Sequence, residues 1–298
     1  MKIPELNSCR MCPRNCGINR YEQTGYCRSG YQIKINTWQK HYGEEPCISG
    51  HCGSGTIFLA GCNLNCVFCQ NYSISQYDNG KEYDIDHVCR IMLELQEKGV
   101  HNINLVSPTH FSLQLREAVI SAKDQGLKIP VIWNTNSYEK VETLMKLEGI
   151  VDIYLADFKY GLDSNSQMYS KVDNYFEIAT QTIKEMFRQK GHISFDDNGI
   201  AKKGLMIRIL VLPEDINSTQ ILLKWLYNNI GTDVYLSLMS QYYPTFHADR
   251  YPEISRFLTK EEYDQAVQTA EYYGFDNCLI QELRPSSYWT PDFNSFDK

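Results

Sequence analysis

Short apolar runs and longer segments of helical periodicity alternate along most of the chain. The apolar runs predict buried strands; they cover residues 56–60, 101–106, 129–133, 151–156, 205–212 and 234–239. The other segments repeat apolar residues on one helical face and predict helices; these cover about 86–98, 111–125, 138–147, 175–190, 219–229 and 260–273. Because strands separated by helices pair in parallel, the pattern predicts an α/β fold of six strand–helix units, fewer than the eight of a closed barrel.

Two weaker patterns and a cysteine-rich region complete the predicted organisation. Residues 31–38 alternate weakly and predict a short strand, and residues 278–283 are a candidate for a last strand. Residues 191–204 are rich in Gly, Asp, Asn and Lys and predict a loop or a short excursion. We expect a cysteine-rich, metal-binding extension at 1–50, packed on a barrel domain at 51–298, with no linker between them.

Composition and charge narrow the class of protein. The 298 residues are 43% hydrophobic and 22% charged, which is ordinary for a globular protein with a core of normal size. A net charge of −7 argues against a broad electrostatic grip on nucleic acid or on an anionic membrane. No apolar run approaches the ~20 residues of a membrane span, and the first residues contain no apolar core of a signal peptide. We therefore expect a cytoplasmic protein with neither nucleic acid nor membrane as a partner.

The cysteines carry the strongest chemical signal. Eleven cysteines in a chain with no secretion signal indicate metal binding more than disulfides. Cys62, Cys66 and Cys69 follow the first predicted strand at the spacing C-x3-C-x2-C. Three thiolates can hold three irons of a [4Fe-4S] cube and leave the fourth open, whereas ordinary electron-transfer clusters use four cysteines. We therefore predict a cluster whose open iron binds another ligand.

Two alternatives exist for these three cysteines. One is a zinc knuckle that lacks a ligand, and the other is a set of reduced structural cysteines. Zinc sites usually pair their cysteines as two separated CxxC halves, which this loop does not do.

A second group, formed by Cys9, Cys12, Cys16 and Cys27, has the spacing C-x2-C-x3-C-x10-C in a segment interrupted by proline and glycine. Four thiolates can close a structural Zn²⁺ site or hold a second, fully ligated Fe–S cluster. Zinc would only hold the fold, whereas an auxiliary cluster could pass electrons to the first one. The spacing leaves both metals open.

The remaining cysteines are less informative. Cys47 and Cys52 lie near His41 and His51 around a glycine-rich segment. They are either further ligands or small residues of a tight turn, which is the ordinary role of such cysteines. The other two cysteines lie in apolar segments and indicate packing.

The three-cysteine loop resembles a known family. The sequence CNLNCVFC, with Phe68 just before Cys69, resembles the signature of the radical S-adenosylmethionine (radical SAM) superfamily. Further segments are similar to one branch of it, the pyruvate formate-lyase-activating-enzyme-like proteins; they are EEPCISG at 44–50, GSGTIF at 53–58, CVFCQNYSIS at 66–75, NINLVSPTHF at 102–111 and VDIYLADFKY at 151–160. The resemblance implies a partial (β/α)6 TIM-type barrel with an N-terminal cysteine-rich extension.

Polar residues gather where the predicted strands end. In parallel α/β barrels the functional groups lie at the C-terminal ends of the strands, and Arg208, inside the strand at 205–212, is costly to bury unless it is paired. The polar residues at these ends are Ser107, Thr109, His110, Asn134, Thr135, Asp157, Lys159, Gln241 and Tyr242. We expect them to encircle one mouth, onto which Cys62, Cys66 and Cys69 open.

The resemblance also implies contacts to the cofactor. Phe68 would lie near the adenine, and Ser107 and Thr109 would meet the methionine amine. The other implied contacts, to the carboxylate, ribose or adenine, are Asn134, Thr135, Asp157, Lys159, Arg208 and Gln241. Two motifs of many activases, a Gly-Gly-Glu after the second strand and a histidine after the sixth, are absent from this sequence. No catalytic residue beyond the cluster ligands is implied.

The function implied by the resemblance is that of an oxidoreductase. In radical SAM enzymes the reduced [4Fe-4S] cluster cleaves S-adenosylmethionine, and the resulting 5′-deoxyadenosyl radical takes a hydrogen atom from the substrate. A flavodoxin or ferredoxin would supply the electron. The substrate is either a partner protein, as for an activase of a glycyl-radical enzyme, or a small molecule, and the sequence leaves both open. The rival hypothesis is a non-catalytic iron–sulfur electron-transfer or metal-binding protein.

Overall fold

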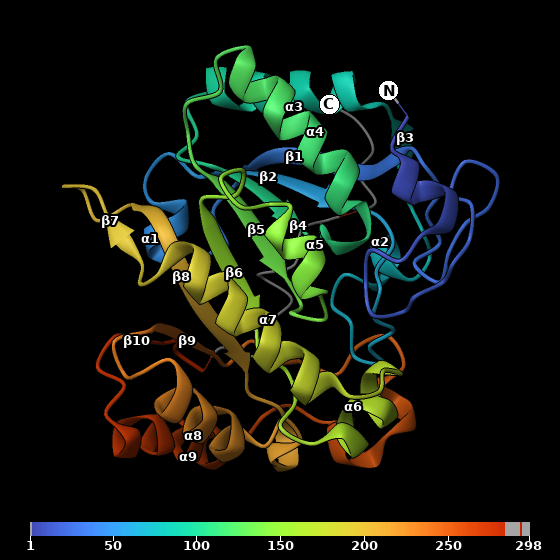
Figure 1. Cartoon of the computed structure of the whole chain (residues 1–298). Helices are drawn as coiled ribbons and strands as arrows, with labels where there is room; N and C mark the ends of the chain where they lie inside the picture. The colour runs from blue at the N-terminus through green and yellow to red at the C-terminus, as the bar shows by residue number, and fades with distance from the viewer. Residues whose placement is uncertain (1, 284–292, 294–298) are drawn as a thin grey trace.

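A continuous, open sheet with helices packed around it dominates the computed structural model, which describes residues 2–283 and 293 (Figure 1). The strand order is β10-β9-β8-β6-β5-β4-β2-β1-β3. Parallel pairing joins β2 (Ser54–Leu59), β4 (Ile103–Val106), β5 (Val131–Thr135), β6 (Ile153–Asp157), β8 (Ala201–Leu210), β9 (Tyr235–Met239) and β10 (Cys278–Ile280). The parallel, unclosed sheet confirms the predicted α/β class, and β10 adds a parallel strand to the six predicted units.

Two antiparallel strands extend the sheet beyond β2. The first, β1 (Ile33–His41), pairs with β2, and β3 (Lys81–Tyr83) pairs with β1. A short β7 (Ser194–Phe195) pairs with β8 off this path, within the segment predicted as a loop or excursion. The strand predicted at 31–38 is therefore present and longer than expected. Although β1 comes from the first fifty residues, it is part of the barrel sheet, and the division of the chain at residue 50 stays a prediction.

Helices connect the parallel strands. The longer ones are α3 (Ile85–Glu97), α4 (Ser112–Asp124), α5 (Val141–Met145), α6 (Asp163–Ser170), α7 (Tyr175–Lys190), α8 (Thr219–Asn229) and α9 (Lys260–Tyr273). The shorter helical turns are η1 (Pro4–Ser8), α1 (Pro46–Ser49), α2 (Tyr72–Ser75), η2 (Thr109–Phe111), η3 (Pro213–Asp215), η4 (Ala248–Arg250) and η5 (Pro252–Ile254). Each helix predicted from periodicity is present within a few residues of its expected bounds.

The structure differs from the periodicity at α5 and α6. The helix α5 begins at Val141 and not at residue 138, because Ser137 adopts a left-handed φ of 63° and the Tyr138 N–H donates to the Asn136 side chain instead of joining a helix. The helix α6 was not predicted, because its sequence DSNSQMYS has almost no apolar residues to form a periodic face.

The first residues of the chain pack against the barrel. Ile3 and Leu6 belong to one hydrophobic cluster with Leu113 of α4. The buried side chain of Arg20 donates a hydrogen bond to the backbone carbonyl of His110, just before α4. The cysteine-rich segment is thus fixed beside the first barrel strands.

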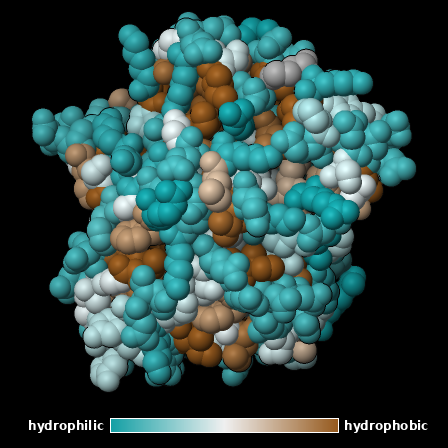
Figure 2. Space-filling model, in the orientation of Figure 1, coloured by the Kyte–Doolittle hydropathy of each residue, from teal (hydrophilic) through white to brown (hydrophobic). Residues whose placement is uncertain are grey.

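The strands are buried and the surface is polar. Every residue of β2, β4 and β5 is buried, as expected for parallel strands covered on both faces. The face shown in Figure 2 is mostly hydrophilic, with hydrophobic groups in separate small areas. Within the described residues, no helix is both long and apolar enough to cross a membrane.

Two neighbouring residues of α5 give a matched test of the core. Leu144 is fully buried and belongs to the main hydrophobic cluster, whereas Met145 is 55% exposed. We expect Leu144→Ala to lower the free energy of unfolding by about 2–5 kcal/mol, because it leaves a cavity, and Met145→Ala to change it by less than about 0.5 kcal/mol. Urea unfolding of both variants checks this, and equal effects would show that α5 does not pack as described.

Candidate functional site

One pocket lies at the C-terminal ends of the parallel strands. Its lining comes from the ends of β2, β4, β5, β6, β8 and β9 and from the loop after β2; it includes Phe58, Cys62, Cys66, Phe68, Cys69, Ser107, Asn134, Thr135, Asn136, Asp157, Lys159, Arg208, Met239 and Gln241. The three cysteines of the C-x3-C-x2-C loop therefore face the polar strand ends across one cavity. Parallel pairing produces this arrangement, because it places all carboxyl ends of the strands on one side of the sheet.

Polar groups hydrogen-bond to each of the three sulfurs. The Ser170 hydroxyl donates to Cys66 Sγ at 2.9 Å, and Ser75 Oγ lies 3.2 Å from Cys69 Sγ. The sulfur of Cys62 accepts from the Leu64 N–H at 3.4 Å and from the Asn136 amide at 3.6 Å. Such hydrogen bonds stabilise thiolate sulfur and tune the reduction potential of a bound cluster.

Burial opposes ionisation of these cysteines when no cation is present. It raises the pKa of Cys62 to about 12 and that of Cys69 to about 11, and it raises the pKa of Cys66 as well. A buried thiolate is therefore stable here only beside positive charge, which a bound metal supplies.

One tight group of potential metal ligands lies outside the pocket. Within the described part of the chain, His51, Cys52 and His101 offer ligand atoms that all lie within 4.8 Å of one another. At the three pocket cysteines, the C-x3-C-x2-C spacing favours a cluster over the paired CxxC halves of zinc sites.

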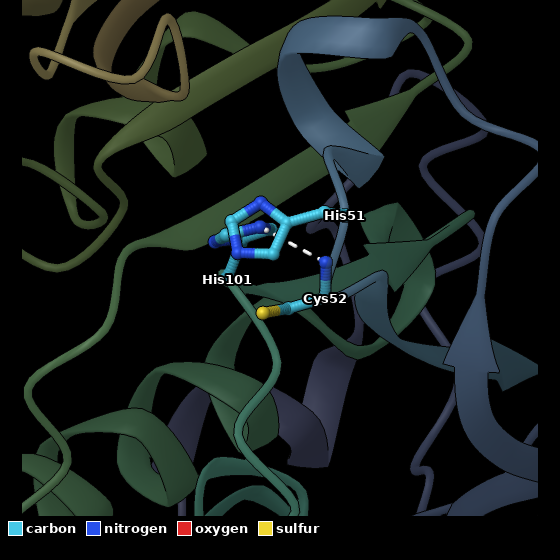
Figure 3. A group of neighbouring side chains, drawn as sticks. All are labelled: His51, Cys52 and His101. Carbon is cyan, nitrogen blue, oxygen red and sulfur yellow. Dashed lines mark hydrogen bonds between the residues drawn. The ribbon is translucent and has the colours of Figure 1, made fainter.

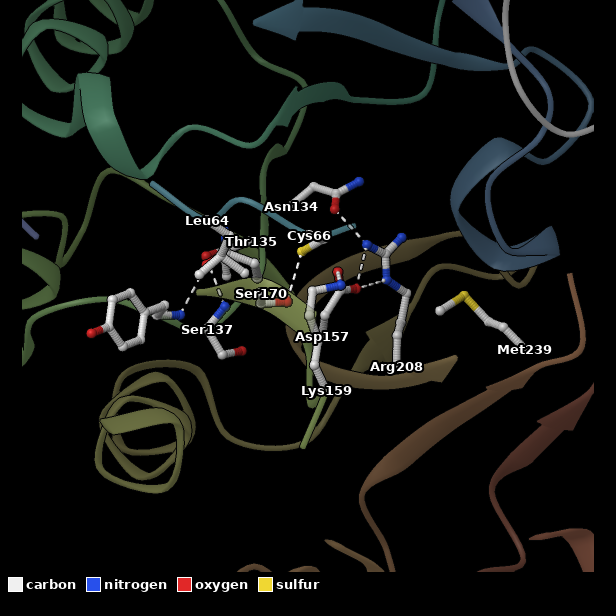
Figure 4. A network of polar contacts seen from close by, with 12 residues as sticks. Leu64, Cys66, Asn134, Thr135, Ser137, Asp157, Lys159, Ser170, Arg208 and Met239 are labelled. Atoms are coloured by element: carbon white, nitrogen blue, oxygen red, sulfur yellow. Dashed lines mark hydrogen bonds and ion pairs between the residues drawn. The ribbon is translucent and has the colours of Figure 1, made fainter. Parts of the chain in front are cut away.

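A chain of buried charges crosses the pocket (Figure 4). Asp157 at the end of β6 accepts from Lys159 Nζ at 2.8 Å and from Arg208 Nε at 2.9 Å. The Arg208 guanidinium also donates to Asn134 Oδ1 at 2.5 Å and lies 3.3 Å from Glu44 Oε2. The structure thus provides the partners that a charged residue inside a strand requires.

Electrostatics keep these groups charged. Burial alone raises the pKa of Asp157, but the positive charges of Arg208 and Lys159 outweigh it and hold that pKa below its usual value. Burial lowers the pKa of Lys159, and the Asp157 charge more than compensates, so the pKa is raised. The pocket therefore holds two cations that are available to an anionic ligand.

Glu44 is a pocket carboxylate that the motif analysis missed. It precedes α1 and lines the pocket, where its Oε1 accepts from the Asn104 amide at 2.8 Å. Burial raises the pKa of Glu44 to about 7, with Arg208 opposing the shift. The EEPCISG segment contained this residue, but no local pattern indicated that it would reach the ends of strands far along the chain.

The expected contacts after β4 and β5 separate into two groups. Ser107 lines the pocket and holds a left-handed φ of 57°, a strained conformation for a residue with a side chain. Thr109 is outside the lining and fully buried; its hydroxyl donates to Glu139 at 2.9 Å. Thr135 lines the pocket, yet its hydroxyl also donates to Glu139, at 2.7 Å. Glu139, a buried carboxylate not singled out from the sequence, therefore holds both threonine hydroxyls.

The remaining expected contacts, Phe68 and Gln241, both line the pocket. The Phe68 ring packs edge-on against Tyr242, with ring centroids 5.9 Å apart. The Gln70 amide donates to the backbone carbonyl of Gln241 at 2.8 Å, which ties the cysteine loop to the end of β9. Asn136 and Gln70 are further lining residues that the sequence analysis did not name as contacts.

The N-terminal cysteines line a second, separate cavity. Its lining includes Cys9, Cys12, Cys16, Cys27, Arg14, Arg20, Asn63 and His110. Burial raises the pKa of Cys12 to about 12, and the other three thiols contribute to the shift.

Two arginines that line this second cavity have unpaired donors. Among the described residues, the buried guanidinium nitrogens without a hydrogen-bond partner include Arg14 Nη2 and Arg20 Nε and Nη2. Positively charged donors left unpaired are costly, so they indicate an anionic occupant such as a metal–tetrathiolate centre. Asn63 connects the two cavities, since it lines the second and directly follows Cys62 of the first.

A family profile and two relatives match the sequence. Residues 56–215 match the profile of the Radical SAM superfamily. An uncharacterized protein of Methanocaldococcus jannaschii, MJ0674, is 34% identical over 281 residues, covering 91% of this chain and 76% of the relative. A second protein of that organism, MJ0808, also uncharacterized, is 25% identical over 181 residues, covering 55% of this chain and 51% of the relative.

Two solved structures share the fold. Streptococcus suis SuiB bound to precursor peptide SuiA aligns with a TM-score of 0.52 and 15% identity, over 74% of this chain and 46% of that one. The FeFe-hydrogenase maturase HydG from Carboxydothermus hydrogenoformans aligns with a TM-score of 0.51 and 10% identity, over 75% of this chain and 52% of that one. This chain spans about half the length of either structure, and the likeness concerns the fold alone.

The raised pKa of Glu44 predicts a pH dependence of stability. Between its ordinary pKa of 4.5 and about 7, the folded protein holds a proton that the unfolded chain releases, so stability falls as the pH rises through this window. In Glu44→Gln this loss is absent. We expect the free energy of unfolding of the variant to match that of the wild type at pH 5 and to fall less than that of the wild type between pH 5 and pH 8.

Urea unfolding of the metal-free protein at both pH values measures the difference. Glu94→Gln, which changes an exposed carboxylate paired with Lys98, is the control and should show little pH-dependent change. Parallel pH profiles of wild type and Glu44→Gln would contradict the expectation.

Proposed function

Because the chain belongs to the radical SAM superfamily, we propose that it is an oxidoreductase in which Cys62, Cys66 and Cys69 hold a [4Fe-4S] cluster and the adjoining pocket binds S-adenosylmethionine. The observation that carries the proposal is that these three cysteines share one cavity with the charged ends of the parallel strands. When bound, the [4Fe-4S] cluster and S-adenosylmethionine would supply reductive cleavage of the sulfonium C–S bond and a 5′-deoxyadenosyl radical that takes a hydrogen atom from the substrate.

The charged chain of the pocket orients the methionine part of the cofactor in this proposal. Lys159 and Arg208 attract its carboxylate, while Asp157 fixes both side chains in place. Glu44 attracts the ammonium group of the cofactor. Asp157 already pairs with two cations, whereas Glu44 pairs with one cation, Arg208, at 3.3 Å. Glu44 thus supplies the carboxylate for which the sequence after β4 has no candidate.

The nucleoside part lies toward the aromatic side of the pocket. Phe68 is held against Tyr242 and offers an apolar edge to the adenine, as the family resemblance implies. Ser107, Asn134, Thr135 and Gln241 supply polar groups around the same cavity. Thr109 acts indirectly, through the Glu139 carboxylate that it shares with Thr135. These residues position the cofactor and exclude water from it.

The substrate is either a partner protein or a small molecule in this proposal. The similarity of five segments to the activating-enzyme-like branch supports hydrogen abstraction from a partner protein, as in an activase of a glycyl-radical enzyme. A small-molecule substrate is the alternative within the same chemistry. A flavodoxin or ferredoxin as the reductant and a cytoplasmic location stay predictions from the sequence. A non-catalytic iron–sulfur protein is the rival class, and a polar pocket beside an incomplete ligand set argues against it.

We further propose that Cys9, Cys12, Cys16 and Cys27 hold a second Fe–S cluster. The four thiols line one cavity with Arg14 and Arg20, whose unpaired guanidinium nitrogens suit an anionic tetrathiolate centre. Asn63 links this cavity to Cys62 through the backbone, and its side chain accepts from the Asn136 amide at 2.8 Å. A second cluster in this place would lie next to the first one and could pass electrons to it.

Release of 5′-deoxyadenosine tests the proposed reaction. Protein reconstituted anaerobically with iron and sulfide and then reduced should release 5′-deoxyadenosine from S-adenosylmethionine. Cys66→Ala removes a cluster ligand and should lower the product to background, whereas Cys278→Ser, in β10 and outside both cavities, should retain activity. Chromatography with mass detection measures the product. If the wild type contains the cluster and yet forms none, the proposed function is wrong.

A second prediction concerns the N-terminal cavity. Replacing Cys12 and Cys27 together by serine should remove about four irons per chain, because a cluster with two missing ligands is lost. Iron and zinc are counted by elemental mass spectrometry, with Cys278→Ser as the control. Unchanged iron together with a loss of zinc would identify a structural zinc site instead.

A further inference from the structure

Three metal-ligating side chains gather at the opposite end of the strands from the pocket. His51 and Cys52 lie between α1 and β2, and His101 lies just before β4 (Figure 3). One potential ligand atom from each residue is within 4.8 Å of those of the other two. Because β2 and β4 run parallel, their amino ends are neighbours, and the segments that precede them meet on this side.

The backbone fixes the two segments relative to each other. The His101 N–H donates to the Gly53 carbonyl at 3.0 Å, and the Gly53 N–H donates to the Ser49 carbonyl at 2.8 Å. Beyond this point Gly55 pairs with Ile103 in the sheet. The turn that carries His51 and Cys52 therefore has little freedom to move away from His101.

The hydrogen bonds and exposure of the three residues bear on metal binding. The Cys52 N–H donates to His101 Nε2 at 3.2 Å, so this nitrogen is unprotonated, and a metal ion bound there would replace this hydrogen bond. The two imidazole rings are edge-to-face with centroids 4.8 Å apart, and Cys52 is a free cysteine. His51 is exposed while the other two are half-buried, which leaves a path for a metal ion from solvent.

We propose that His51, Cys52 and His101 form a mononuclear site for Zn²⁺, with a fourth position open to water. Two imidazoles and one thiolate are ligands that zinc prefers, and no carboxylate belongs to the group, which disfavours the hard cations Mg²⁺ and Ca²⁺. Tetrahedral zinc places such ligand atoms about 3.3–3.8 Å apart, so binding would draw the three side chains closer than the observed separations of up to 4.8 Å.

Zinc at this position would fasten the segment that leads to the pocket. The segment that contains α1 connects Glu44 and Glu45 to the turn at His51, and the Ile48 carbonyl of α1 accepts from the Asn102 side chain at 2.8 Å. Coordination of one ion by His51, Cys52 and His101 would cross-link this segment to the residue before β4. The site is independent of the proposed radical chemistry, and its test can fail without affecting that function.

The experiment uses the full chain with its iron sites loaded, so that added zinc does not enter empty cysteine sites. After equilibrium dialysis against Zn²⁺, elemental mass spectrometry should find one zinc per chain with the iron content unchanged. X-ray absorption at the zinc edge, which iron does not mask, should show one sulfur and two nitrogen ligands. Zinc absent from the wild-type chain, or zinc bound by sulfur alone, would overturn the proposal.

Matched variants assign the ligands. His51→Ala, Cys52→Ser and His101→Ala should each weaken zinc binding by at least about tenfold, since a change in even the outer shell of a metal site has effects of this size. His192→Ala and Cys278→Ser replace the same residue types elsewhere and should bind zinc as the wild type does. His51 is exposed, so its variant should fold normally, which circular dichroism and iron content verify. Unaltered zinc binding in His51→Ala and Cys52→Ser would also refute the site.

Discussion

The buried guanidinium of Arg208 requires charged and polar partners, and these partners connect distant parts of the chain at the pocket. Asp157 comes from the neighbouring strand β6, Asn134 from β5, and Glu44 from the segment before the first parallel strand. Removing Asp157, the nearer of the two carboxylates, would leave the Arg208 charge poorly compensated, which typically costs about 3–5 kcal/mol. This requirement links the carboxyl ends of three strands and the loop of Glu44 into one polar wall.

The three cysteines depend on this wall and on the groups behind them. Their loop leaves β2 and is held by the Gln70 amide, which donates to the Gln241 carbonyl at the end of β9, and by Ser170 at the end of α6. Burial disfavours free thiolates here, while hydrogen bonds and the nearby Lys159 favour them in part. A bound metal resolves this conflict, which explains why a buried cysteine loop and a charged pocket occur together in a member of the radical SAM superfamily.

The metal chemistry that we propose is distributed over both ends of the sheet. Cys62 lines the first cysteine cavity, and the next residue, Asn63, lines the second. On this side the cysteine-rich segment packs beside the start of α4. The His51–Cys52–His101 group lies at the amino ends of β2 and β4. The segment with α1 extends between the two ends, since Glu44 reaches the pocket and His51 reaches the other side.

The sequence by itself determined the strand–helix alternation, the parallel α/β class and the cysteine loop, because hydrophobic periodicity and ligand spacing are local properties. It also placed Asp157 and Lys159 at a strand end and Arg208 inside a strand. Only the tertiary structure decided which groups those residues meet: Glu44 joins Arg208, Thr109 turns to Glu139, and His101 meets Cys52. These contacts join residues far apart in the chain, and strand register and the burial of charge fix them, neither of which leaves a periodic signal in the sequence.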